Sequence, residues 1–334
     1  MPALWCNASI AVLLLAAMLD FVLGDPWHWL HPVQVMGWGI QHYQAGVFKC
    51  ISSAWGQRLA GVGLGLGLPL VSGAIAAGMV ILAGRIHIGL AIAIAAILLA
   101  SCLAARSLRR AATEVLTPLS QGDLVTARAR LGLYVGRDTE QLSETEILRA
   151  VMETISENAT DGVMAPLFYG LLGLGIAPAA GVGFAIAYKA LSTLDSMIGY
   201  KTPPYQDLGW FSARCEDLVT WLPCRLTVIT IALLSRHPRQ VWRLCCRDAP
   251  IDPSPNAGWS ECAYAAALGV QLGGVNRYRG EVKHKPLLAE PLQPITMALI
   301  EQGLKLTRWS ILSWLLGGIV IAFIFSGVAS GASF

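Results

Sequence analysis

Acidic side chains recur at helical spacing in the segment 136–170, which reads GRDTEQLSETEILRAVMETISENATDGVMAPLFYG. Ser143 followed by Glu146 predicts a capping box that starts a helix. Arg149 is placed to pair with Glu153, four residues further along that helix. The helical period puts Ile147 and its apolar neighbours on the opposite face. The face they leave is acidic and carries Glu146, Glu153, Glu157 and Asp161.

This acidic stripe runs directly into an apolar segment, which carries Glu157, Asn158 and Asp161 to a predicted membrane boundary. A solvated helix face is the ordinary explanation of such a stripe. Charge at the edge of a membrane is costly, however, and this favours a functional role. Several carboxylates in one place suit Mg²⁺, which takes oxygen ligands and commonly bridges nucleotide phosphates.

A second polar group lies in the segment 187–201, AYKALSTLDSMIGYK. Lys189, Ser192 and Ser196 share a helical face, with Asp195 beside it. Two interpretations remain open. Lys189 and Asp195 form a neutralised pair at a helix end, or Lys189 contacts a phosphate while Asp195 contacts a metal ion or an amine.

A third polar group interrupts the apolar N-terminal region in the segment 19–37, LDFVLGDPWHWLHPVQVMG. Its Gly, Asp and Pro residues end the first helix. Asp25 and His31 are thereby placed at the membrane edge, where ionisable groups are costly unless they are used. The alternative is a helix cap together with an interfacial aromatic belt formed by Trp27 and Trp29.

The segment 252–290 contains a tight turn, SPNAG, and then a helix of small residues that is expected to run from Trp259 to Leu272 and to carry Glu261. A Gly-Gly pair ends this helix. Glycine-rich turns and basic side chains can bind phosphate, although a basic tail is more often a solvated or lipid-facing surface. The tail carries Arg277, Tyr278, Arg279, Lys283 and Lys285.

The composition indicates which environment must hold these groups. Of the 334 residues, 55% are hydrophobic and only 13% are charged, and the mean hydropathy is +0.56. This charged fraction is about half that of an average soluble domain. A water-soluble enzyme, a disordered chain and a coiled coil are therefore disfavoured. The net charge of +3 and the lack of basic runs interleaved with aromatics argue against a nucleic-acid partner.

We expect an all-α, polytopic helical membrane protein that forms a single membrane-embedded domain over residues 1–334. Predicted spans cover 10–23, 59–82, 86–103 and 309–325. Two polar segments, 106–160 and 235–308, are rich in arginine and lysine and are predicted to be cytoplasmic helical insertions. The region 161–234 either crosses the membrane twice, or forms a hairpin broken at Pro178 that is followed by a helix that does not cross.

Several catalytic and metal-binding motifs are missing. The run GVGLGLGLPL lacks the G-K-[ST] end of a phosphate-binding loop and lies within a predicted span, where it is expected to pack helices closely. The eight cysteines include no C-x-x-C pair, so most are interpreted as small apolar residues.

The ordered set of motifs resembles the CobD/CbiB family of adenosylcobinamide-phosphate synthases. The resemblance rests on GDP…HPV at 24–33, GRDT at 136–139, ENATDGVMAPLFY at 157–169, YKALSTLDSMIGYK at 188–201, SPNAGW at 254–259 and LGG…Y.G at 272–280. It covers roughly residues 10 to 325. Each motif alone is weak, and it is their order that is specific.

The resemblance implies an inner-membrane enzyme with a cytoplasmic active site. Such an enzyme joins the ring D propionate of adenosylcobyric acid to (R)-1-aminopropan-2-ol or its O-phosphate, and uses ATP and Mg²⁺. The product is adenosylcobinamide or its phosphate. Possible protein partners are other cobalamin-assembly enzymes or a second copy of the chain.

On this basis, Asp25 or His31 is predicted to take the amine proton. Lys189, Arg137 and Lys285 are predicted to hold phosphates. The predicted magnesium ligands are Glu153, Glu157, Asp161 and Asp195. The predicted substrate-binding residues are Arg137, Asp138, Asn158, Ser192, Asn256, Glu261, Tyr278 and Lys285.

Two other classes of function stay open. A corrinoid carrier or transporter would place its ionisable residues in broken helices at mid-membrane, and Pro178 is compatible with such a break. A regulatory membrane protein similar to the AmpE proteins is the third possibility. Most of the charge lies in the polar insertions, which favours chemistry at the membrane surface.

Overall fold

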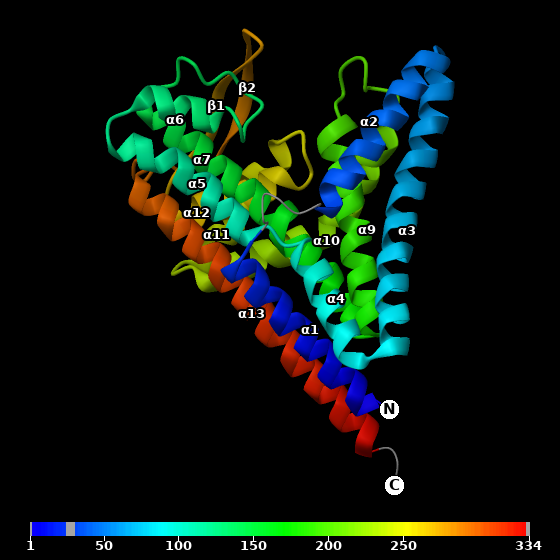
Figure 1. Cartoon of the computed structure of the whole chain (residues 1–334). Helices are drawn as coiled ribbons and strands as arrows, with labels where there is room; N and C mark the ends of the chain where they lie inside the picture. The colour runs from blue at the N-terminus through cyan, green and yellow to red at the C-terminus, as the bar shows by residue number, and fades with distance from the viewer. Residues whose placement is uncertain (1, 25–30, 332–334) are drawn as a thin grey trace. The chain divides into compact units, whose positions relative to one another are not determined.

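The computed structural model describes residues 2–24 and 31–331, and most of them are helical (Figure 1). The chain divides into two compact units. Unit 1 comprises Met1–Ala104, Ala165–Thr220 and Trp314–Phe334, and unit 2 comprises Ala105–Met164 and Trp221–Ser313. Two of the four boundaries between them fall inside helices, α10 (Trp210–Leu234) and α13 (Met297–Gly331).

The remaining helices of unit 1 are α1 (Pro2–Val22), α2 (Pro32–Cys50), α3 (Ala54–Ile86), α4 (Ile88–Ala100), α8 (Ala165–Leu174) and α9 (Pro178–Ile198). Unit 2 holds α5 (Ala105–Ser120), α6 (Leu124–Leu131), α7 (Glu144–Ala159), a π-helical turn (Thr160–Met164), α11 (Pro238–Asp248), a 3₁₀ turn (Ala249–Ile251), α12 (Ala257–Leu268), β1 (Leu272–Tyr278) and β2 (Glu281–Leu288).

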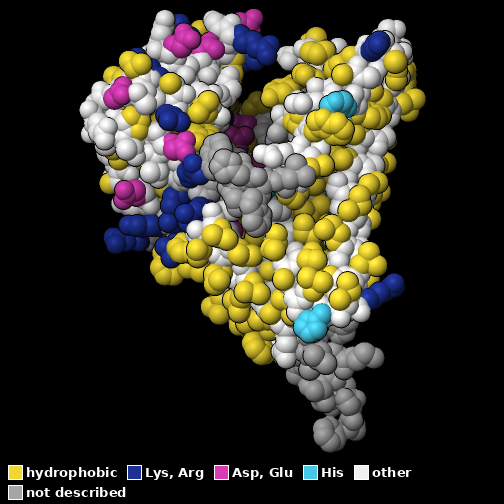
Figure 2. All heavy atoms as spheres, in the orientation of Figure 1, with side chains coloured by type: hydrophobic (Ala, Val, Ile, Leu, Met, Phe, Trp, Pro, Cys, Tyr) yellow, Lys and Arg dark blue, Asp and Glu magenta, His cyan; other side chains and the backbone are white. Residues whose placement is uncertain are grey.

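Four apolar helical stretches of the described chain are long enough to cross a membrane, and they confirm the predicted fold class. They are Ala54–Ile86, Ile88–Ser120, Trp210–Leu234 and Met297–Ile324. The expected spans 59–82 and 309–325 lie on α3 and α13. The expected N-terminal span lies on α1, whose apolar part, Asn7–Val22, is shorter than these four. Hydrophobic side chains cover the outer surface of α3, at the right edge of Figure 2.

Glycines allow α3 and α9 to pack closely within unit 1, at a position just beyond the run GVGLGLGLPL. A Cβ atom on Gly73 of α3 would lie 2.7 Å from the backbone oxygen of Gly183 on α9. Within the run itself, a Cβ atom on Gly65 would lie 2.6 Å from the ring of Phe211 on α10, which confirms close helix packing there. Any larger side chain at Gly73 would force the two backbones apart.

The region after Asp161 forms a helical hairpin. α8 ends at Leu174, and α9 begins with Pro178 in its first turn, which is the position proline favours. The two helices pack so closely that a Cβ on Gly173 would lie 2.4 Å from the backbone oxygen of Ala180. The hairpin agrees with one of the two expected arrangements, whereas α10 is long and apolar enough to cross, as the other requires. The number of crossings therefore stays a prediction.

The predicted capping box of α7 is confirmed. The Ser143 side chain accepts a hydrogen bond from the backbone of Glu146, and the Glu146 carboxylate accepts one from the backbone N–H of Ser143 at 2.7 Å. Ile147 and Ile155 are buried in the core of unit 2. Glu153 is also buried, so the acidic stripe is not a uniformly solvated face. Asp161 lies in the π-helical turn, where the α-helical spacing used to place it no longer applies.

The predicted helix Trp259–Leu272 is too long, and the basic tail after it is not a tail. α12 ends at Leu268 because Gly269 adopts a left-handed conformation with φ of +67°. β1 and β2 then pair antiparallel, with Asn276 opposite Lys283 and Tyr278 opposite Glu281. Both polar segments predicted as insertions lie in unit 2, but the second is not wholly helical. That they are cytoplasmic stays a prediction.

Candidate functional site

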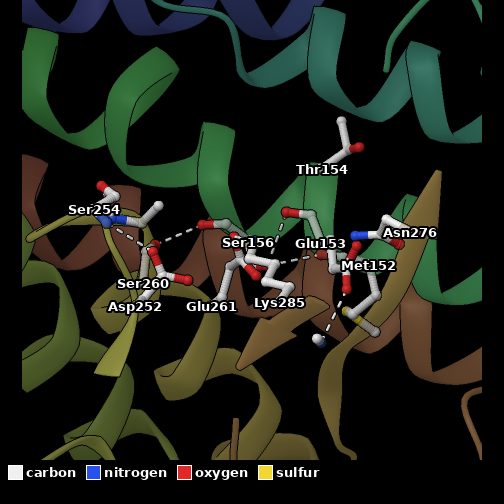
Figure 3. A network of polar contacts seen from close by, with 12 residues as sticks. Met152, Glu153, Thr154, Ser156, Asp252, Ser254, Ser260, Glu261, Asn276 and Lys285 are labelled. Carbon is white, nitrogen blue, oxygen red and sulfur yellow. Dashed lines mark hydrogen bonds and ion pairs between the residues drawn. The ribbon is translucent and has the colours of Figure 1, made fainter. Parts of the chain in front are cut away.

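Glu153 is the centre of a dense polar network that joins α7 to β1. Its carboxylate pairs with Arg137 and with Arg149, the latter at 3.3 Å, and it accepts the backbone N–H of Gly273 at 3.0 Å. The side-chain oxygen of Asn276 accepts from both arginines, at 2.9 and 3.1 Å. Figure 3 shows Glu153 beside Asn276 at the start of this network. The predicted Arg149–Glu153 pair is thus confirmed and is one part of a larger cluster.

The backbone of β1 is fitted to this network at Gly273. The residue has φ of +88°, and a Cβ atom there would lie 1.9 Å from the backbone oxygen of Pro286. Only glycine adopts this conformation without strain. Arg149 donates to the backbone oxygens of Gly273 and Val275. The Gly-Gly pair therefore serves to bring the strand against α7.

A second carboxylate, Glu261 of α12, pairs with Lys285 of β2. The Lys285 ammonium lies 2.5 Å from Glu261 Oε1, and the carboxylate is fully buried. Its other oxygen, Oε2, is buried without a hydrogen-bond partner among the described residues. Burial raises the pKa of Glu261 to about 8, against the opposing effect of Lys285. Burial alone would lower the pKa of Lys285, but the carboxylates of Glu261, Glu153 and Glu157 raise it on balance.

Glu157 of α7 belongs to the same cluster. Desolvation raises its pKa although part of its surface is exposed, and the carboxylates of Glu153 and Asp252 add to the shift while Lys285 opposes it. Glu157 and Glu261 thus share one ammonium group. Because burial raises the pKa of Glu261 to about 8, this carboxyl group is expected to hold a proton at neutral pH.

Short hydrogen bonds tie α7 to α12 beside these carboxylates. The Ser260 hydroxyl donates to the backbone oxygen of Ser156 at 2.5 Å and lies 2.7 Å from the hydroxyl of Thr160. Figure 3 shows Ser260 and Ser156 near Glu261. These contacts fix the distance between Glu157 and Glu261.

Asn256 stands at the start of α12 and is held by a cation. Its side-chain oxygen accepts from Arg225 at 2.7 Å. The Arg225 guanidinium lies between two indoles, 5.0 Å from the ring centroid of Trp221 and 4.7 Å from that of Trp259. Asn256 is itself buried.

Asp138 fixes the tip of the hairpin. Its two carboxylate oxygens accept the backbone N–H groups of Arg279 and Gly280, at 2.9 and 2.7 Å. Tyr278, on the adjoining strand, carries Lys283 over its ring at 5.4 Å. The GRDT motif thus contributes Arg137 to the Glu153 network and Asp138 to the turn.

Comparison with known proteins decides the family. A model described as CobD/Cbib protein matches residues 13–307. The cobalamin biosynthesis protein CobD of Synechocystis sp. is 52% identical over 97% of this chain and 96% of its own length. The chain belongs to the CobD/CbiB family. CobD of Halalkalibacterium halodurans is 39% identical over 92% of the chain, and CbiB of Salmonella typhi is 39% identical over 90%, covering 96% and 91% of those proteins.

Membership of the CobD/CbiB family gives this chain a role in cobalamin biosynthesis, as a membrane-embedded biosynthetic enzyme. No solved structure matches the chain significantly.

The other residues predicted from the CobD/CbiB resemblance are placed as follows. His31 caps α2, and its Nδ1 accepts the backbone N–H of Val33 at 3.2 Å, as the helix-cap alternative expects. Asp25, Trp27 and Trp29 lie outside the described residues. Asn158 donates to the backbone oxygen of Thr154 within its own helix.

Lys189, Ser192 and Asp195 lie half-buried on α9 in unit 1. No ion pair between Lys189 and Asp195 is found among the described residues, so the neutralised-pair interpretation gains no support. The part of these residues in a shared site stays a prediction.

The magnesium ligand set predicted for this family member is only partly compatible with the structure. Within the described residues, no three His, Cys, Asp or Glu side chains are close enough to hold a metal ion together. Glu153 is a poor ligand because two arginines and a backbone N–H use its oxygens. An ion that arrives on nucleotide phosphates needs only one or two protein carboxylates. Glu157, and Glu261 with its unpartnered Oε2, fit that smaller requirement.

The sequence alone did not identify three residues of the cluster as candidates. Asn276 links the two arginines, and Arg225 holds Asn256. Asp252 lies near Glu157, and its buried Oδ2 has no hydrogen-bond partner among the described residues. Asp252 and Asn276 lie inside or directly beside matched motifs, which is the signal that could have found them. Arg225 is the single charged residue in the apolar part of α10, residues 218–234, which is the signal that could have found it.

Proposed function

We propose that the chain catalyses ATP-dependent amide formation between adenosylcobyric acid and (R)-1-aminopropan-2-ol or its O-phosphate. Family membership supports this reaction class. The observation that carries it in the structure is the buried Lys285–Glu261 pair beside Glu157, with one oxygen of Glu261 lacking a partner. A structural ion pair would be expected to have both oxygens satisfied, so this cluster is suited to receive a ligand.

The reaction needs an activated acid, because a carboxylate does not condense with an amine in water. In the proposed sequence, an oxygen of the corrinoid propionate attacks the γ-phosphorus of ATP and ADP leaves. The amine nitrogen then attacks the acyl carbon, and inorganic phosphate leaves as the amide forms. One proton must be removed from the amine during this step.

Lys285 is the residue suited to hold a phosphoryl oxygen, since phosphoryl transfer depends on positioning and on neutralising charge. Desolvation raises the pKa of Glu157 and raises that of Glu261 to about 8, and a carboxylate with a raised pKa is suited to accept the proton of the amine. Magnesium bound to the nucleotide would supply charge neutralisation at the same carboxylates. Arg137 and Arg149 are engaged by Glu153, and we assign them to the scaffold instead of to phosphate binding.

We also propose an inner-membrane location with unit 2 in the cytoplasm, where ATP is present. The density of arginine and lysine in 106–160 and 235–308 supports this orientation. Other cobalamin-assembly enzymes and a second copy of the chain remain the proposed protein partners.

The test is product formation by the full-length protein in detergent. Adenosylcobyric acid, ATP and Mg²⁺ are incubated with aminopropanol in one reaction and with its O-phosphate in another, and the product is identified by mass. We expect a mass gain equal to amide formation that depends on ATP. Comparison of the two amines identifies the substrate.

Two variants make the test specific to the cluster. Glu261→Gln is expected to lower turnover about a hundredfold, as the loss of one catalytic electrostatic contact does. Glu290→Gln, which changes a surface carboxylate paired with Arg247, is the matched control and is expected to be unaffected. Corrinoid binding without product would favour the carrier. Neither binding nor product would favour the regulatory protein.

A further inference from the structure

Helix α11 (Pro238–Asp248) has two chemically different faces. Val241, Leu244 and Cys245 are buried in the core of unit 2. The opposite face is exposed and carries residues spaced at i, i+3, i+4 and i+7, which lie together on a helix. These residues are Arg239, Trp242, Arg243 and Cys246.

The arginines of this face have no acidic partners. Arg239 and Arg243, together with Arg236 two residues before α11, make no ion pair within residues 2–24 and 31–331. Arg247, on the same helix, differs because it pairs with Asp248 at 2.6 Å and with Glu290 at 3.1 Å. Three neighbouring unpaired guanidinium groups form a strongly cationic surface, which favours an anionic partner.

The position of this surface indicates which anionic partner it fits. α11 starts four residues after Leu234, the last residue of the membrane-capable helix α10. Leu233 is 72% exposed at that end of α10, and Trp242 is 42% exposed on α11. A half-exposed indole among arginines, directly beside the end of an apolar span, is the composition of a helix at a lipid–water interface.

We propose that the exposed face of α11 binds the headgroups of anionic phospholipids at the membrane surface. The arginines contact lipid phosphates, and Trp242 enters the boundary between headgroups and acyl chains. Basic clusters next to a transmembrane helix favour anionic lipids because each cation adds to the attraction of the charged surface. An acidic protein partner would account for the arginines but not for the exposed apolar residues beside them.

This binding site is separate from the Glu153 and Glu261 clusters and does not depend on the proposed reaction. It would fix the depth of unit 2 at the membrane. That depth would then depend on the amount of anionic lipid in the membrane.

The first measurement is the depth of α11. Cys246 is an exposed thiol on the proposed lipid face, and a nitroxide label there reports the local environment. The full-length protein carries Cys6→Ser, Cys50→Ser and Cys215→Ser, so that Cys246 is the accessible thiol among those described. It is reconstituted in phosphatidylcholine vesicles with or without phosphatidylglycerol. We expect the label to be accessible both to oxygen and to a polar nickel reagent, as at a lipid–water interface. We expect it to lie deeper in the vesicles that contain phosphatidylglycerol.

The second measurement is lipid selectivity, read as the ratio of phosphatidylglycerol to phosphatidylcholine retained by the purified protein in native mass spectrometry. The triple variant Arg236→Gln, Arg239→Gln, Arg243→Gln is expected to lower that ratio by about fivefold for each arginine removed. The matched control removes three exposed cations from the hairpin and is expected to keep the ratio. It consists of Arg277→Gln, Arg279→Gln and Lys283→Gln.

A label at Cys246 that reads as fully aqueous in both vesicles would overturn the proposal and direct the search to an acidic protein partner. Equal loss of selectivity in the α11 and hairpin variants would also overturn it, because net charge alone would then explain the effect. The three substituted arginines are exposed and make no ion pair in the described part of the chain, so the thermal unfolding midpoint is expected to stay unchanged and serves as the check on folding.

Discussion

Two buried carboxylates of unit 2, Glu153 and Glu261, differ in how fully their oxygens are paired. Glu153 is matched by two arginines and a backbone N–H, and Asn276 satisfies the arginines in turn. Glu261 has one lysine for one oxygen, and its second oxygen has no partner among the described residues. Both lie where α7, α12 and the hairpin meet, so the difference does not come from burial.

The comparison separates a scaffold from a site. A carboxylate whose hydrogen-bonding capacity is filled stabilises the fold and has little left for a ligand. A carboxylate left partly unsatisfied costs stability, and its raised pKa shows that cost. A buried residue that lowers the stability of the fold is typical of a functional site.

The largest expected effect is the loss of stability on changing Glu153, the carboxylate assigned to the scaffold. Glu153→Gln leaves Arg137 and Arg149 facing each other without a counter-charge. We expect the free energy of unfolding to fall by about 3–5 kcal/mol, the usual cost of breaking a buried ion pair. Thermal unfolding in detergent measures it. Glu144→Gln, an exposed residue in the first turn of α7, is the control, and an equally small change in both variants would contradict the assignment.

The next prediction concerns Lys285 and tests whether the Glu261–Lys285 pair belongs to the functional site. Lys285→Met is expected to lower turnover about a hundredfold or more, through loss of the cation that holds the phosphoryl group. The unfolding midpoint should change less than in Glu153→Gln, because Glu261 can remain neutral when its partner is removed. Lys283→Met, on the same strand, is the control. A large loss of stability with normal turnover in the folded fraction would place Lys285 in the scaffold.

A pH series sharpens the comparison further. The pKa of Glu261 is raised from 4.5 to about 8, so the folded protein binds a proton more tightly than the unfolded chain does. The resulting stability is fully present below about pH 4.5 and is lost as the pH rises to about 8, with a slope of at most about 1.4 kcal/mol per pH unit.

Unfolding midpoints measured across this pH range check the sign. Glu261→Gln is expected to gain stability relative to the wild-type chain as the pH rises, because the variant has no carboxylate to ionise there. Glu290→Gln should keep the wild-type slope. Parallel curves for all three proteins would show that Glu261 does not titrate in this window.

The smallest expected effect is at the hairpin tip. Asp138→Ala removes the acceptor for the backbone N–H groups of Arg279 and Gly280. Because the site is exposed, we expect a loss of about 1 kcal/mol. Thermal unfolding measures it, and Glu140→Ala, an exposed carboxylate two residues away, serves as the control. A loss as large as that in Glu153→Gln would mean that the tip is part of the scaffold.

Local spacing predicted the features that depend on neighbours in the chain. The capping box of α7, the Arg149–Glu153 pair and the close packing of the glycine-rich span each follow from residues a few positions apart. The helical membrane fold follows from composition and from the length of the apolar runs.

Long-range partners could not be predicted in this way. The second arginine on Glu153 is Arg137, which lies in a loop. The cation on Glu261 comes from a strand for which the sequence indicated only a basic tail. The hairpin depends on the left-handed conformation of Gly269 and on the register of two short strands, which packing determines. The position of Asp161 could not be predicted either, because the π-helical turn departs from α-helical spacing.

The interrupted course of unit 2 along the chain has a consequence for biosynthesis. Glu153 and Gly273 hydrogen-bond to each other although 120 residues separate them. Since the N-terminal portion of a protein leaves the ribosome first, α7 is complete long before β1 is made. The carboxylates of α7 therefore lack their partners from β1 in a partly folded intermediate while the intervening helices are synthesised. Any delay in making the second half prolongs the exposure of that intermediate to proteases and chaperones.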